Sequence, residues 1–174
     1  MFDWLNSHVN PKTGMWGDPN GDDFLQPVNG FYRLTRGAYA QFGVPVPYPE
    51  QAIDTLLLHS ANTVYFRDNR GTSCNVLDVI HPLWLCAKQT DYRKSEGKAW
   101  ALWQTSRILD NWQPGEGFSF ELDRRVPAGL MGTEMWLSVL YLFVDYLGLG
   151  EILGYKPKGV HRVEVAFQLE DLKQ

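Results

Sequence analysis

The order of apolar and polar positions along the chain repeats three times. Each repeat consists of an amphipathic helical segment, a loop rich in Gly, Asn and Asp that carries aromatic residues, and a second helical segment that begins with small or polar residues. The repeats cover residues 1–47, 48–91 and 92–154, and a tail follows at 155–174. Because one helical hairpin cannot bury its apolar face alone, neighbouring hairpins are expected to stack. The pattern therefore predicts a single all-α domain of three antiparallel helical hairpins, with an inner and an outer helical layer.

Proline and glycine positions indicate where the helices begin and end. The outer helices are expected near residues 2–9, 49–61 and 92–112, and the inner helices near 29–42, 74–88 and 132–150. Pro49 suits a first helical position, and Gly43 and either Gly148 or Gly150 suit the residue after a helix. Pro82 is expected to disrupt the helical turn around it. In the tail, apolar and polar residues alternate at 160–169, which predicts one short strand or extended segment.

Two loops share a Gly close to an aromatic residue. The segments TGMW at 13–16 and QPGEGF at 113–118 resemble the Gln/Gly/Trp repeat signatures of the terpenoid-cyclase and six-hairpin α/α-toroid superfamily. Asn10 stands where Gln would be expected in the first of them. The resemblance implies about half of a toroid, since a closed ring of this type has about six hairpins, and closing it would need further repeats or self-association into a homo-oligomer. It also implies an active cavity at the N-terminal ends of the inner helices.

Composition and charge narrow the range of partners. Hydrophobic residues make up 44% of the 174 residues and charged residues 21%, as in an ordinary globular protein. The net charge is -4 and the Lys and Arg residues are scattered, which argues against nucleic acid as a partner. The apolar runs fall short of the ~18 residues that span a bilayer, and Met1 leads directly into a predicted helix, so a cytoplasmic protein without membrane contact is predicted. The two cysteines are too few for a disulfide framework.

Aromatic residues are numerous, with 7 Trp, 8 Tyr and 9 Phe. Chains of this composition often line a cavity or a partner surface. The candidate platforms for a substrate are Trp16, Tyr65, Phe66 and Phe118. On the first inner helix, Asn29, Arg33 and Arg36 are spaced to contact an anionic substrate, although a solvated helical stripe explains them equally well.

The beginning of the second inner helix holds the richest group of reactive side chains. Cys74, Asp78 and His81 occupy positions i, i+4 and i+7 of one helical face. Prenyltransferases of the same superfamily bind zinc through Asp, Cys and His, but in a different order and spacing. Core packing is therefore the favoured interpretation, and no metal or other cofactor is predicted. Cys74 is a candidate substrate contact, and a role as nucleophile would need a base that the sequence does not identify.

Two carboxylates are the candidate acid and base of a glycosidase-type reaction. Asp78 lies in an apolar context one turn inside its helix, and Glu134 lies in the first turn of the third inner helix, where an acidic residue is also favoured electrostatically. The Asp-x-Asp-Asp and Asp-Asp-x-x-Asp motifs of terpenoid cyclases are absent. The sequence thus predicts a carbohydrate-active toroid enzyme, or part of one, with a small-molecule or glycan substrate. The alternatives are a non-catalytic helical-repeat scaffold and a prenyltransferase- or cyclase-like protein.

Overall fold

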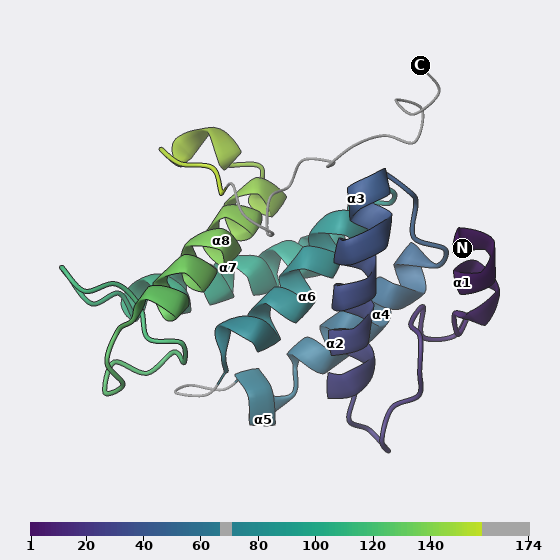
Figure 1. Ribbon diagram of the computed structural model, residues 1–174, viewed down its shortest axis with the longest axis horizontal. Coiled ribbons are helices and arrows are strands. Elements are labelled where there is room, and N and C mark those ends of the chain that lie inside the picture. Colours follow the sequence, from purple (N-terminus) through teal and green to yellow (C-terminus); the bar gives the residue numbers. More distant parts are fainter. Residues whose placement is uncertain (67–70, 158–174) are drawn as a thin grey trace.

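The computed structural model describes residues 1–66 and 71–157, and every regular element in these residues is a helix (Figure 1). The predicted all-α class is therefore confirmed for this part of the chain. The strand predicted at 160–169 lies outside the described residues.

Three helices lie side by side in one layer, with α6 in the middle (Figure 1). They are α2 (Leu25–Leu34), α6 (Ser73–Cys86) and α8 (Leu130–Leu147). Behind them in this view, α4 (Pro49–Ser60) packs against α6 and α2, and α7 (Lys94–Asp110) packs against α8. The shorter elements are α1 (Phe2–His8), α3 (Ala40–Phe42), α5 (Thr63–Phe66) and the 3-10 turn η2 (Gly150–Ile152). The buried apolar side chains form one contiguous core.

The helix that contains α2 is longer than the sequence predicts. It begins at Leu25 rather than near Asn29, and its first backbone N–H donates to the Asp23 carboxylate at 2.9 Å. At the other end α3 stops at Phe42, and Gly43 follows in the left-handed conformation with φ 64°. The predicted end of this helix is therefore confirmed.

Between α2 and α3 the same helix contains a π-helical turn, η1 (Thr35–Tyr39). The backbone N–H of Ala40 bonds to the carbonyl oxygen of Thr35, five residues earlier. The Thr35 hydroxyl donates to the carbonyl oxygen of Phe31 at 2.8 Å, which helps to satisfy the backbone of the preceding helical turn. Single π-helical turns of this kind are frequent at functional sites.

Helix α6 runs through Pro82 without interruption, so the predicted disruption of this turn is wrong. Pro82 has no N–H, and the carbonyl oxygen of Asp78, four residues earlier, therefore loses its usual helical donor. Packing against α2, α4 and α8 buries most side chains of α6, and this burial holds the helix together despite the lost bond. At its beginning, Thr72 caps the helix by accepting a hydrogen bond from Asn75 N at 3.3 Å.

Helix α8 is the most apolar element and ends at Gly148 in the left-handed conformation, as predicted. Its 18 residues have a mean hydropathy of 1.2, so by length and composition it reaches the lower limit for a membrane-spanning helix. Half of the helix is buried inside the fold, and core helices meet the same criteria.

The two loops with the repeat signatures contain the same backbone turn. Gly14 N donates to Asn10 O at 2.8 Å, and Gly117 N donates to Gln113 O at 2.9 Å. Both glycines have positive φ, and a side chain on Gly14 would overlap the backbone of Ala52 at the beginning of α4. The two loops thus share this hydrogen bond, with Asn10 in the place of Gln113.

Candidate functional site

The side chain of Asp78 lies inside the fold, where α6 faces α2 and η1. It is 5% exposed. Burial raises the pKa of Asp78 from its usual 3.8 to about 7, because a charged carboxylate loses its hydration there, and the positive charges of Arg33 and Arg36 oppose part of this rise. Near neutral pH a large fraction of this carboxyl group therefore keeps its proton.

The two arginines approach Asp78 from the neighbouring helix. Arg33 is exposed at the end of α2, and its Nε donates to Asn29 Oδ1 at 2.6 Å. Arg36 belongs to η1, and its guanidinium carbon lies 5.5 Å from the centre of the Tyr32 ring. The Nε of Arg36 is buried and has no hydrogen-bond partner among the described residues. Asn29 and Arg33 are thus hydrogen-bonded neighbours on α2, and Arg36 follows in η1. Their role as substrate contacts stays a prediction.

Three more side chains complete the group around Asp78. Burial raises the pKa of the Tyr32 hydroxyl to about 12, with Asp78 and Cys74 adding to the rise and Arg36 opposing it. Burial and the charge of Asp78 also raise the pKa of the Cys74 thiol. Cys74 therefore keeps its proton at neutral pH, which disfavours its use as a nucleophile. The His81 ring contacts the edge of the Tyr32 ring at 5.3 Å between centres.

These residues do not form a metal-binding group. In residues 1–66 and 71–157 no three His, Cys, Asp or Glu side chains are clustered as metal ligands. What the group offers is a buried acid, Asp78, next to the positive charges of Arg33 and Arg36. Such an arrangement can donate a proton to a bound substrate and can hold a negatively charged part of it.

Glu134 has a different environment from Asp78. It is exposed near the beginning of α8, and the Ser138 hydroxyl donates to its Oε1 at 3.3 Å within the same helix. Glu134 is not among the charges that shift the pKa of Asp78, which come from Arg33 and Arg36. The structure therefore surrounds Asp78 with residues of α2 and η1, and Glu134 lies on the other neighbour of α6.

The four aromatic candidates serve mainly in packing. Phe66 and Phe118 are 3% and 2% exposed and belong to the core. Trp16 stacks on Phe31 with ring centres 5.6 Å apart, and its Nε1 donates to Leu5 O at 2.9 Å. The half-buried Tyr65 donates its hydroxyl to Asp23 Oδ2 at 2.8 Å. The prediction of Phe66 and Phe118 as open platforms for a substrate is therefore wrong, because both side chains are buried in core contacts.

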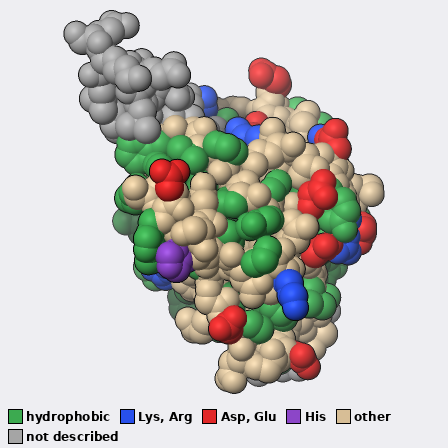
Figure 2. Space-filling view, turned by 90° about the vertical axis from the view of Figure 1, so that its right-hand side faces the viewer, with side chains coloured by type: hydrophobic (Ala, Val, Ile, Leu, Met, Phe, Trp, Pro, Cys, Tyr) green, Lys and Arg blue, Asp and Glu red, His purple; other side chains and the backbone are tan. Residues whose placement is uncertain are grey.

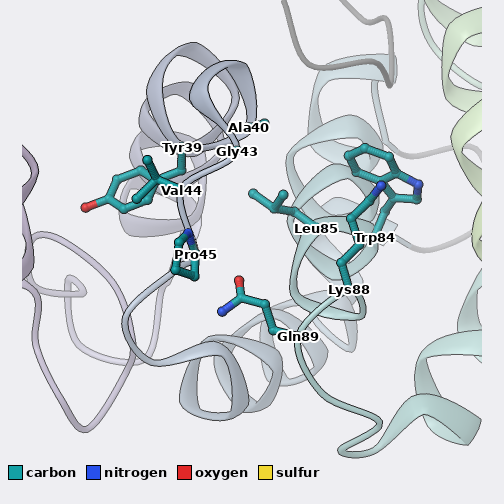
Figure 3. Close-up of a pocket in the computed structure, with 9 residues that line it drawn as sticks. All are labelled: Tyr39, Ala40, Gly43, Val44, Pro45, Trp84, Leu85, Lys88 and Gln89. Carbon is teal, nitrogen blue, oxygen red and sulfur yellow. The ribbon is translucent and has the colours of Figure 1, made fainter. Parts of the chain in front are cut away.

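Two pockets lie at the opposite end of α6 from Cys74. The first, of about 250 Å³, lies between the end of α3 and the end of α6 (Figure 3). The second, of about 290 Å³, lies between the ends of α6 and α8 and the beginning of α7. Trp84 and Lys88 line both. The sequence prediction of a cavity at the N-terminal ends of the inner helices gave no indication of these pockets.

Tyr32 and the pocket residues were missed for different reasons. Tyr32 stands one residue before Arg33, and the spacing of Tyr32 and Arg36, four residues apart on a helix, is a local signal that could have included it. The pockets combine residues from four separate segments of the chain, at 39–45, 84–89, 94–98 and 145–148, and no local pattern indicates that these segments meet. Comparisons of the chain with protein-family models, curated proteins and solved structures give no match.

Proposed function

We propose that the protein is a carbohydrate-active enzyme of the α/α-toroid type, or part of one, in which Asp78 is the general acid. The observation that carries the proposal is the buried Asp78 carboxyl, with its pKa of about 7, beside Arg33 and Arg36. A carboxyl group that keeps its proton near neutral pH can protonate a leaving-group oxygen. The two arginines favour a substrate with a carboxylate, such as an acidic sugar, or another small anion.

Two features of the fold support the toroid part of this proposal. The long helices lie in two layers, with α2, α6 and α8 adjacent in one of them. The loops before α2 and α8 contain the same turn, from Asn10 to Gly14 and from Gln113 to Gly117. Repetition of a turn together with a pair of helices is the sign of a repeat architecture, and three such hairpins would make half of a ring.

Glu134 is the proposed partner of Asp78. It is an exposed carboxylate on α8, the helix that packs against α6 on the side away from α2. In glycoside hydrolysis the second carboxylate activates water or attacks the sugar directly, and an exposed group is suited to the ionised form that both roles need.

Hydrolysis of oligosaccharides by the purified protein tests this function. The substrates are neutral and uronic-acid-containing oligosaccharides, and the readout is the release of new reducing ends across pH 5 to 8. We expect activity on an acidic oligosaccharide and a loss of kcat of about 100-fold or more in Asp78→Asn, because general acid catalysis contributes at least this much. We expect Glu134→Gln to lose activity by a similar factor.

Glu151→Gln is the matched control, because Glu151 is also an exposed carboxylate near the end of an apolar helix. It should retain the activity of the unmodified protein. Activity that survives unchanged in Asp78→Asn would exclude Asp78 as the acid. Absence of hydrolysis on every substrate, together with no shift in melting temperature from any of them, would favour the binding scaffold described next.

A helical-repeat scaffold is the second candidate function, and exposed apolar side chains favour it. Figure 2 shows the side of the molecule at which α1 lies, where hydrophobic side chains form several patches between acidic groups. In α1 the Trp4 side chain is exposed, and on α7 Leu102 and Leu109 are 62% and 56% exposed. Such faces at the ends of a helical array favour contact with further hairpins or with a second copy of the chain.

A further inference from the structure

The two pockets at the end of α6 share two lining residues, Trp84 and Lys88. Figure 3 shows the first pocket, with Tyr39 and Val44 on one wall and Leu85 and Trp84 on the other. The second pocket begins at Trp84 and Lys88 and extends to α7 and α8. The two pockets therefore adjoin at Trp84 and Lys88.

The first pocket offers mainly carbon atoms to a ligand, because its polar groups are bonded elsewhere. The Tyr39 hydroxyl points away from the opposite wall and donates to Asn6 Oδ1 at 2.6 Å. The Gln89 amide forms two hydrogen bonds with Val46, accepting from its N at 2.9 Å and donating to its O at 3.0 Å. The pocket is therefore suited to an apolar group, and about 250 Å³ lies just below the size range of pockets for drug-like ligands.

The second pocket is positively charged. It is lined by Lys88, Lys94 and Lys98, with Asp145 as the acidic residue among its lining side chains. Asp145 accepts a hydrogen bond from Trp84 Nε1 at 2.7 Å, and Lys94 is paired with Asp91 at 2.6 Å.

The ammonium group of Lys88 lies at the boundary of the two pockets, 3.9 Å from the centre of the Trp84 ring. The Lys98 ammonium reaches Leu147 O at 3.4 Å, at the end of α8. Lysines at the end of a helix also stabilise the helix, so a test must distinguish that role from binding.

We propose that the joined pockets bind a small organic anion, with its apolar group between Tyr39 and Leu85 and its carboxylate or phosphate against Lys88. The apolar first pocket and the positively charged second pocket match the two halves of such a ligand. This site is independent of the proposed chemistry at Asp78, because it uses the other end of α6.

Calorimetric titration with octanoate, octyl phosphate and octanol tests the proposal. We expect octanoate or octyl phosphate to bind with a dissociation constant of about 1 mM or below, and octanol to bind about five- to tenfold more weakly, because it lacks the charge. The comparison of the two anions identifies the preferred head group. Raising the salt concentration should weaken the binding of the anion and leave that of octanol nearly unchanged.

Two variants locate the site. Lys88→Met keeps the length and the apolar stem of the side chain but removes the charge, and it should weaken anion binding about five- to tenfold. Ala40→Phe should fill the first pocket and abolish binding of all three compounds. Lys12→Met, in an exposed loop that lines neither pocket, should bind like the unmodified protein.

The proposal is overturned if neither anion binds, or if octanol binds as tightly as the anions. Equal anion binding by the unmodified protein, Lys88→Met and Ala40→Phe would also overturn it. If Lys88 only stabilised the end of α6, Lys88→Met would lower the melting temperature without changing the affinity. Circular dichroism on each variant shows whether it is folded before the titration.

Discussion

Asp78 is buried, so its carboxylate has little hydration when the group ionises. Its folded pKa of about 7 lies above the usual value of 3.8, so the unfolded chain releases this proton at a lower pH than the folded one. The contribution of Asp78 to stability is therefore most favourable below pH 4 and is lost as the pH rises towards 7. Arg33 and Arg36 reduce this loss, and the nearby Tyr32 and Cys74 remain protonated over the same range.

We expect Asp78→Asn to be more stable than the unmodified protein at pH 8, by up to about 4 kcal/mol, and nearly equal to it at pH 4. The amide resembles the protonated carboxyl in shape and carries no charge at any of these pH values. Urea denaturation between pH 4 and pH 8 measures the free energy of unfolding of both proteins. A difference that stays constant across this range would show that the pKa of Asp78 is not raised by folding.

The sequence identified Asp78 from its apolar neighbours but gave a poorer account of the aromatic candidates. An acidic residue within a helix of almost wholly apolar residues has few places to be other than the interior. Phe66, in contrast, ends the four-residue helix α5, and Phe118 lies in a loop. Both pack against the core, and segments this short have no periodicity from which burial can be predicted. The neighbours of Asp78 are set by the packing of α2 against α6, and this packing cannot be predicted from local sequence patterns.

At the scale of elements, glycines mark where a helix and its neighbour approach most closely. A Cβ on Gly132, in the first turn of α8, would lie 2.6 Å from backbone atoms of Phe118, Ser119 and Phe120. Backbone atoms cannot move aside as a flexible side chain would. The loop before α8 can therefore pack this closely against the helix only because residue 132 is glycine.

We expect Gly132→Ala to lower the free energy of unfolding by roughly 1–3 kcal/mol, because the new methyl group has no space. Gly30→Ala is the matched control, since Gly30 is also helical and has no atom within 4 Å of the added Cβ. That change should stabilise the protein by about 0.5–1 kcal/mol through helix propensity alone. Urea denaturation of both variants checks the pair, and equal effects would contradict the close approach at Gly132.

Helix existence was predictable and some helix details were not. Apolar residues at helical spacing, Pro49 at a helix start and glycines at helix ends fixed the positions of α4, α6 and α8. The early start of α2 follows from Asp23, whose carboxylate accepts from Leu25 N, a local signal that the prediction did not use. The π-helical turn at Thr35–Tyr39 could not be predicted, because it gives the sequence no periodic pattern of its own. Pro82 is tolerated because burial outweighs one lost hydrogen bond.

For the whole molecule, the apolar face on the outside of α7 predicts association. Leu102 and Leu109 are seven residues apart on one helical face and are both exposed. We expect the protein to form dimers at concentrations of tens of micromolar, and the double variant Leu102→Gln with Leu109→Gln to be monomeric. Sedimentation velocity measures both. Glu151→Gln, which is exposed and lies outside α7, should leave the association unchanged.

If both proteins are monomeric at all concentrations, self-association through α7 is excluded. A dimer that persists in the double variant would place the contact on another face, such as that around α1 and the exposed Trp4. The global arrangement was the least accessible property from sequence, because hairpins of equal pattern can stack in an open array or in a closed ring.

The pairing of Gln89 with Val46 has a consequence for how the parts of the chain lose their structure. The side-chain amide imitates a peptide group, and its two hydrogen bonds connect positions 43 residues apart. The segment between α3 and α4 is thereby attached to the end of α6 instead of acting as a free linker. At this end of the molecule, that segment and the end of α6 therefore cannot move apart without breaking both hydrogen bonds.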